Sequence, residues 1–183
     1  MTSIDYLEKV TIGSIAELSG QTILHEYNPH WEVDFRHEKT RIEKALRSKG
    51  IIVEHVGSTS VPGLCAKPVI DMLLLVKNST DEDSYVRPLQ DIGYTLRIRE
   101  PEWFEHRMFK RKSPEVNLHV FSVGCEEARR MIVFRNWLRN NTTDRELYAA
   151  AKRKLAVRNW KYIQEYADAK SEIVREIFRH IRG

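Results

Sequence analysis

The segment from Val69 to Val76 constrains the fold more than any other part of this chain. It is a run of apolar residues interrupted by one acid, Asp71. A run this apolar is typical of a strand that is covered on both faces, in the middle of a sheet. An acid in such a strand is costly to bury unless it is paired, hydrogen-bonded or bound to a metal. Asp71 is therefore either a functional residue, or a structural one that pairs with Lys67 or accepts backbone N–H groups.

The segments around this strand predict a mixed sheet flanked by helices. Apolar residues recur at helical spacing from Asn28-Pro29 onward and stop at Gly50, which predicts a helix there. Residues 80–92 predict a shorter helix that is weakened near Pro88, because proline lacks the backbone donor that a helix interior uses. Further strands are predicted at residues 51–56, 94–99 and 117–123.

The last third of the chain predicts a block of helices. Thr143 is followed three residues later by Glu146, which predicts a capping box at the start of the second helix of this block. A third helix is expected after Trp160. The expected fold class is therefore α+β, in one unit over residues 1–183. A mixed α/β core occupies about residues 23–124, and a helical part occupies about 125–183.

Composition narrows the class of protein. With 42% hydrophobic and 31% charged residues, a disordered or collagen-like chain is excluded. No apolar run is long enough for a membrane helix, and the first ten residues lack the apolar core of a signal peptide. Cys65 and Cys125 are too few for a disulfide scaffold, so reduced thiols and a cytoplasmic location are expected.

Charge is distributed unevenly along the chain. The total is +4, but residues 1–125 carry a net −2 and residues 126–183 a net +6. The basic last third is either a set of solvated helix faces or a surface that favours an anionic partner. Single anion contacts are offered by Arg107, Lys110 and Arg135, among which no spacing rule chooses. The basic stretch around Lys110, with Ser113-Pro114 as a turn, is interpreted as a connection between strands.

A Gly-Ser turn directly follows the predicted strand at residues 51–56. Gly57 and Ser58 begin the sequence GSTSVPG, and such a turn offers free backbone N–H groups and a hydroxyl to a phosphate. Lys67, four residues before Asp71, adds a positive charge. His55, just before the turn, is expected to support it through a hydrogen bond.

Several motifs in order resemble one family. They are YNPHW at 27–31, EHVGSTSVPGLCAKPVIDMLLLV at 54–76, NLHVF at 117–121, VFRNWL at 133–138 and YADAK at 166–170. This pattern resembles the GrpB family, whose members are similar to the nucleotidyltransferase superfamily of DNA polymerase beta. The resemblance implies a nucleotidyltransferase-like mixed sheet with flanking helices and a C-terminal helical block. It covers nearly the whole chain from about Thr11 onward.

The resemblance also implies roles for particular residues. Gly57 and Ser58 match the turn that holds nucleotide phosphates, and Asp71 matches the first of two acids that hold catalytic metal ions. The second acidic position is Leu73, so the acidic pair is incomplete, and two-metal chemistry needs more carboxylates. Phosphate binding is expected at Gly57, Ser58, Lys67, Lys152 and Lys170, with Tyr166 and Asp168 as neighbours. The alternative for the helical residues is a solvated face with salt bridges.

His119 is the candidate for a second metal ligand. It shares a strand face with Asn117, and together with Asp71 it would hold one divalent ion, Mg²⁺ or Mn²⁺, that arrives with a phosphate ligand. The alternative for His119 is a hydrogen-bonded structural residue.

Three functions follow as hypotheses. The chain is an enzyme that transfers a nucleoside monophosphate, a non-catalytic module that binds a nucleotide or another phosphate-containing small molecule, or a structural partner. The third rests on the analogy of family members fused to dephospho-coenzyme A kinase. Leu73 favours the second over a conventional enzyme. No membrane partner is expected, and a nucleic acid is the less favoured anionic partner.

Overall fold

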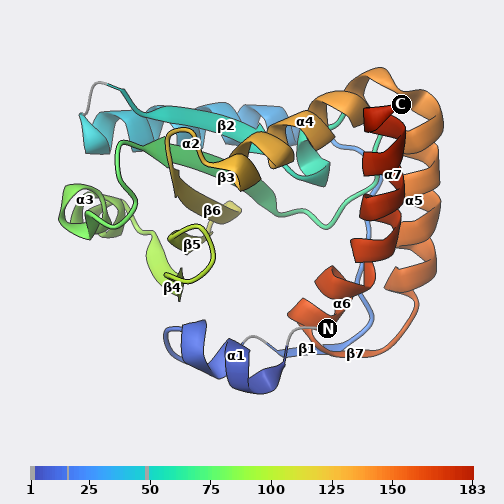
Figure 1. The fold of residues 1–183 in the computed structure, drawn as a ribbon, viewed down its shortest axis with the longest axis horizontal. Helices are drawn as coiled ribbons and strands as arrows, with labels where there is room; N and C mark the ends of the chain where they lie inside the picture. Colours follow the sequence, from blue (N-terminus) through green and yellow to red (C-terminus); the bar gives the residue numbers. More distant parts are fainter. Residues whose placement is uncertain (1–2, 16, 48–49) are drawn as a thin grey trace.

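The computed structural model describes residues 3–15, 17–47 and 50–183, and its core is one five-stranded sheet (Figure 1). The strand order is β2-β3-β6-β5-β4, and only β3 and β6 run parallel. In register, Asp71 of β3 lies opposite Asn117 of β6, and Leu73 lies opposite His119. The strands are β2 (Ile52–Val56), β3 (Ile70–Val76), β4 (Thr95–Glu100), β5 (His106–Lys112) and β6 (Glu115–Ser122).

One face of the sheet is sealed by α2 (His30–Leu46) and α3 (Val86–Asp91). Side chains alternate along a strand, so the even-numbered residues of β3, such as Met72 and Leu74, join the apolar cluster beneath these helices. The odd-numbered residues, among them Asp71 and Leu73, point to the opposite face. The acid in this apolar strand therefore lies on the less densely covered side of the sheet.

The opposite face is covered in part by α4 (Glu126–Asn140), which packs on an apolar cluster that includes Leu73. The other C-terminal helices stand at one end of the sheet, where α5 and α7 lie side by side (Figure 1). They are α5 (Thr142–Ala156), α6 (Ile163–Ala169) and α7 (Ser171–Arg182).

The N-terminal segment closes the remaining side. Helix α1 (Ile4–Val10) contacts β4, and β1 (Glu17–Gly20) pairs with β7 (Trp160–Tyr162) in a small second sheet. Short 3₁₀ turns follow β2 and β3, namely η1 (Ser58–Ser60) and η2 (Glu82–Ser84). No described helix is long and apolar enough to cross a membrane.

The predicted α+β class is confirmed, with a mixed sheet, flanking helices and a helical C-terminal part. The four predicted strands all lie in the one sheet. The interpretation of the basic stretch as a connection is wrong, because His106–Lys112 forms β5 between β4 and β6. This segment holds three consecutive charged residues, Lys110, Arg111 and Lys112, and no β-branched residue, so the sequence shows neither strand alternation nor strand propensity.

Three helix boundaries also differ from the prediction. The predicted helix at 80–92 is split into η2 and α3, with the break before Val86 and not at Pro88, which lies in the first turn of α3 where proline is tolerated. The prediction of a capping box at Thr143 is wrong, because Asn141 is the N-cap of α5 and its side chain accepts a hydrogen bond from the backbone N–H of Asp144. The predicted third helix is divided into α6 and α7 at Lys170.

Candidate functional site

The Gly-Ser turn packs directly on the acid of β3. Gly57 has φ +67° and ψ −170°, a backbone conformation that essentially only glycine adopts. A Cβ added at Gly57 would lie 2.8 Å from the Cβ of Asp71 and would overlap with its carboxylate. The prediction that Asp71 lies beside this turn is confirmed. Glycine is needed here both for its φ and for the close approach.

Hydrogen bonds from both sides hold the turn in place. The His55 ring bonds through Nε2 to the Thr59 hydroxyl (3.1 Å), and that hydroxyl donates to the carbonyl of Val69 (3.2 Å). Arg139 of α4 donates to the carbonyl of Ser60 (2.9 Å). The expected support from His55 is confirmed.

The turn leaves donors free. Within the described part of the chain, the backbone N–H groups of Ser58 and Thr59 donate to no other protein group. The Ser58 hydroxyl interacts with the buried Tyr148 of α5, where it opposes the rise in the pKa of Tyr148 that burial causes. Unused backbone donors at a turn after a strand are suited to an anion.

Asp71 is held by an amide, not by a lysine. Asn117 donates to its Oδ1 (2.9 Å), and no lysine of the described chain comes within 4.0 Å of the carboxylate. The alternative of an Asp71–Lys67 ion pair is therefore not observed. Burial raises the pKa of Asp71, while Asn117 and the charges of Lys170, Lys67 and Lys110 oppose that rise.

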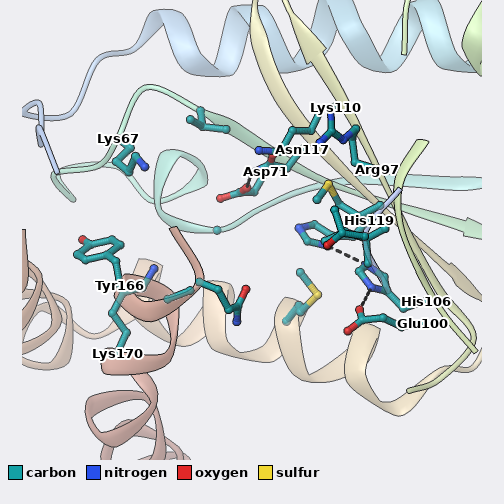
Figure 2. Close-up of a pocket in the computed structure, with 18 of the residues that line it drawn as sticks. Lys67, Asp71, Arg97, Glu100, His106, Lys110, Asn117, His119, Tyr166 and Lys170 are labelled. Atoms are coloured by element: carbon teal, nitrogen blue, oxygen red, sulfur yellow. Dashed lines mark hydrogen bonds and ion pairs between the residues drawn. The ribbon is translucent and has the colours of Figure 1, made fainter. Parts of the chain in front are cut away.

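Three lysines from different elements surround this carboxylate (Figure 2). Lys67 precedes β3, Lys110 belongs to β5, and Lys170 joins α6 to α7. Burial lowers the pKa values of Lys67 and Lys170, and the carboxylate of Asp71 partly offsets this for both. Their charges exceed that of the single acid, so the site is electropositive when the lysines are protonated.

Lys152 and Tyr166 form the wall beside these lysines. Lys152 of α5 is buried, donates to the carbonyl of Cys65 and lies over the Tyr148 ring. Burial lowers the pKa of Lys152 to about 7. The Tyr166 hydroxyl of α6 is buried and has no hydrogen-bond partner. Lys152 is thus not part of a solvated face, and Tyr166 offers an unused polar group.

The residues that the family resemblance assigns to phosphate or metal binding line one cavity of about 730 Å³, here called the central cavity. It is enclosed by the open face of the sheet, α1, α4 and the α6 region. The predicted residues among its lining are Gly57, Ser58, Lys67, Asp71, His119, Lys152 and Lys170. Sequence reasoning did not find Glu100 and His106, which also line it and belong to β4 and β5.

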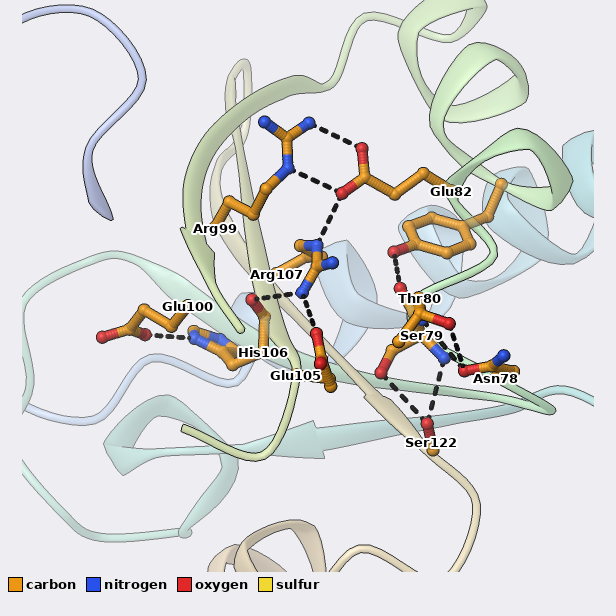
Figure 3. A network of polar contacts seen from close by, with 11 residues as sticks. Asn78, Ser79, Thr80, Glu82, Arg99, Glu100, Glu105, His106, Arg107 and Ser122 are labelled. Carbon is orange, nitrogen blue, oxygen red and sulfur yellow. Dashed lines mark hydrogen bonds and ion pairs between the residues drawn. The ribbon is translucent and has the colours of Figure 1, made fainter. Parts of the chain in front are cut away.

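Three residues, Arg107, Lys110 and Arg135, were candidates for single anion contacts, and of these Lys110 alone lines the central cavity. Arg107 points away and donates to Glu82 (2.6 Å) in a separate ionic network (Figure 3). Arg135 donates to Glu54 (2.6 Å) and to the carbonyl of His55. Lys110 lines the cavity near Asp71.

The donor set for a metal ion is small. Asp71 and His119 point to the same sheet face but are out of register by two residues, because the partner of Asp71 is Asn117. Among the described residues, no group of three or more histidine, cysteine or acidic side chains could hold a metal. These residues fit only a cation that brings most of its oxygen ligands with it, so the metal role of His119 stays a prediction.

Comparisons with known proteins identify the family. The family described as GrpB protein matches residues 21–180. UPF0157 protein BH1888 from Halalkalibacterium halodurans is 55% identical over 173 residues, which cover 94% of this chain and 89% of that protein.

Two further similarities involve a solved structure and a longer protein. The crystal structure of conserved protein GrpB from Enterococcus faecalis has a TM-score of 0.67 at 28% identity, over 85% of this chain and 99% of that one. A dephospho-CoA kinase from Mycolicibacterium paratuberculosis is 26% identical over 178 residues, covering 83% of this chain but 44% of that protein. The family match spans most of the sequence, and it shows that the chain belongs to the GrpB family.

Proposed function

We propose that this chain binds a phosphate-containing small molecule, of which a nucleotide is the favoured class, in the central cavity. The observation that carries the proposal is an excess of positive charge without acidic partners in ion-pair contact. Lys67, Lys110, Lys152 and Lys170 line the cavity with Asp71, and none of the four makes an ion pair within 4.0 Å in the described chain. Lys152 is buried and the other three are half-buried, and cations withdrawn from water without counter-ions are costly, a cost that an anionic ligand would remove.

The Gly-Ser turn supports a phosphate in particular. Free N–H groups at Ser58 and Thr59 suit the oxygens of a tetrahedral anion, and Lys67 and Lys170 would neutralise its charge. The Tyr166 hydroxyl lacks a partner that such a ligand would supply. One divalent ion, Mg²⁺ or Mn²⁺, would be carried in by a di- or triphosphate and touch Asp71, where it would neutralise phosphate charge.

Transfer of a nucleoside monophosphate is the reaction that this site would perform as an enzyme. With Leu73 in place of a second acid, the carboxylates for a second metal ion are missing. We therefore expect binding to be stronger than turnover, and we expect any catalysis to use one cation or none.

A thermal-shift screen tests the proposal, because a ligand that binds only the folded state raises its apparent stability. The panel compares pyrophosphate and nucleoside mono-, di- and triphosphates with the neutral nucleosides, each with and without Mg²⁺. Phosphate-bearing compounds should raise the melting temperature, and nucleosides should not. Lys170→Met should abolish the shift.

The matched control for Lys170→Met is Lys39→Met, on α2 on the far face of the sheet, where Lys39 lies near Glu43. This variant should retain the full shift. Equal shifts in both variants, or shifts with neutral nucleosides alone, would contradict phosphate binding at this site.

A non-catalytic partner module is the second candidate. It is favoured by the similarity to a dephospho-CoA kinase, of which this chain matches less than half. A purely structural role gives no reason for unpaired lysines in a cavity, so we place it second. An absence of binding by every phosphate compound in the screen would reverse that order.

A further inference from the structure

A bulge in the edge strand β4 places Arg97 at the central cavity. The register of β4 against β5 shifts between Leu96 and Ile98, so Arg97 is the extra residue of the bulge. Leu96 packs in the apolar cluster on the closed face, whereas Arg97, Ile98 and Glu100 all line the central cavity. Strict alternation cannot bring those three side chains to one face, but a bulge can, and bulges re-aim side chains beside binding sites.

The segment that follows α1 holds Arg97 in position. Arg97 Nη2 donates to the carbonyl of Ser14 (2.6 Å), and the backbone carbonyl of Arg97 accepts from the N–H of Ile12 (2.8 Å). A β-bridge between Thr11 and Ile98 fastens the same segment to β4. The orientation of the guanidinium is therefore set by the protein itself, which lowers the entropic cost of binding a ligand there.

One donor of this guanidinium is unused. Arg97 Nε is buried and donates to no group of the described chain, and no described acid lies within 4.0 Å of the side chain. Arg99, two residues further along β4, instead donates to both carboxylate oxygens of Glu82 (2.7 and 2.6 Å; Figure 3). The strand thus pairs one arginine fully with an acid and leaves the other, which is permanently charged, without one.

The acids at the central cavity are engaged elsewhere. Among the described residues that line it, Glu100 accepts from the Tyr6 hydroxyl (2.8 Å) and Glu127 accepts from Arg130 (3.0 Å). Asp71 accepts from an amide of the neighbouring strand (2.9 Å). A buried donor of a cation that faces a cavity is costly to leave unpaired, and an anionic ligand would pair it.

Lys110 of β5 is the neighbouring cation. Its partner in the ladder is Thr95, which lies two residues before Arg97 and on the same face of the sheet. Diagonal neighbours of this kind are within reach of long side chains. Both Lys110 and Arg97 line the central cavity, and Lys110 has no ion pair within 4.0 Å among the described residues.

This cationic pair is separated from the Gly-Ser turn. Asp71, Asn117 and Lys110 lie in one row across β3, β6 and β5. Because neighbouring strands are about 4.8 Å apart, the backbone of Lys110 lies about 10 Å from that of the acid beside the turn, and β4 is one strand further. Figure 2 shows Arg97 and Lys170 on opposite sides of Asp71.

We propose that Arg97 and Lys110 form a second anion-binding subsite in the central cavity, on the order of 10 Å from the phosphate at the Gly-Ser turn. It takes a carboxylate or a phosphate group, because the Arg97 Nε–H is a charge-assisted donor to either. The ligand is then one molecule with an anionic group at each end, or a nucleotide together with a separate anionic acceptor. The inference rests on the proposed function, whose ligand it extends.

Calorimetric titration with a matched pair of ligands tests the first of these. Octylphosphonate and octamethylene bisphosphonate have the same apolar chain, and only the second carries an anion at both ends. The wild type should bind the bisphosphonate at least about tenfold more tightly. Arg97→Met should remove this advantage and leave the affinity for octylphosphonate unchanged. Arg99→Met, the matched control on the same strand, should keep the full advantage, because Arg99 pairs with Glu82 on the other face.

A second arm tests a separate acceptor. Sulfate is titrated into protein saturated with pyrophosphate, and binding that is present in the wild type and lost in Arg97→Met would assign the subsite to a second molecule. Arg97→Lys keeps the charge without the planar guanidinium, so it should retain part of the effect in either arm, and it serves where Arg97→Met does not fold.

The outcomes separate the two proposals. If octylphosphonate or pyrophosphate binds but neither arm depends on Arg97, the second subsite is refuted and the proposed function stands. If neither compound binds to the wild type, the proposed function fails, and the second subsite fails with it. Equal losses in Arg97→Met and Arg99→Met would also overturn the inference, because they would trace the effect to β4 as a whole.

Discussion

Gly57→Ala is the substitution whose effect follows most directly from the geometry of the site. The new methyl group would adopt φ +67° with ψ −170°, a region that costs a non-glycine residue about 1–3 kcal/mol. It would also lie 2.8 Å from the Cβ of Asp71, closer than carbon atoms approach, which adds about 1–3 kcal/mol of overpacking. We expect the free energy of unfolding to fall by about 2–6 kcal/mol, measured by urea denaturation.

Two further variants separate the causes. Gly124→Ala also places alanine at a positive φ, +86°, but with nothing within 4 Å of the new methyl group, so it should cost only about 1–2 kcal/mol. In an Asp71→Ala background, where the carboxylate is gone, the cost of Gly57→Ala should fall by about 1 kcal/mol. Equal costs for the two glycine variants, or strict additivity with Asp71→Ala, would refute the claim that turn and acid are in contact.

Three other substitutions test the chemistry of the cavity. Asp71→Asn should raise the free energy of unfolding at pH 7, because burial raises the pKa of Asp71 and its ionised form opposes folding. In a pH series of denaturation curves this gain should vanish below about pH 4, where the wild-type carboxyl is protonated in both states. A lower free energy of unfolding at pH 7 would contradict the prediction. Ser58→Ala should weaken pyrophosphate in calorimetry by about tenfold, and unchanged affinity would exclude the hydroxyl as a contact. The pKa of Lys152 is about 7, so the affinity of the wild type for sulfate, which does not titrate in this range, should fall as pH rises from 6 to 8. Lys152→Met should bind sulfate more weakly, and its affinity should depend less on pH. An equal pH dependence in both proteins would show that another group causes it.

The sequence pattern predicted the part of the site that is formed by the turn after β2 and by β3 itself. A single acid in an apolar strand and glycine in a turn after a strand are local signals, and both Asp71 and Gly57 lie where those signals place them. Strand alternation also placed His119 on the face of Asp71. Lys170 is far along the chain, and it was selected only through the family resemblance.

The hydrogen-bonded side chains behind His119 were not predictable from local pattern. His106 lies in β5, whose charged residues carry no strand signal, and its position beside His119 is set by pairing with β6. Glu100 and Tyr6 join from β4 and α1, so three separate segments must fold before the chain of hydrogen bonds exists. Contacts of this kind depend on tertiary packing, on which a single sequence gives no information.

The measurement that tests the central claim most directly is calorimetric titration of the metal-free protein with pyrophosphate, at fixed ionic strength. Pyrophosphate has neither base nor sugar, so its binding reports only on the Gly-Ser turn and the lysines of the central cavity. We predict saturable one-to-one binding to the wild type and to Lys39→Met, and at least a tenfold loss of affinity in Lys170→Met. No detectable heat with the wild type, or equal affinity in all three proteins, would contradict an anion site at this position.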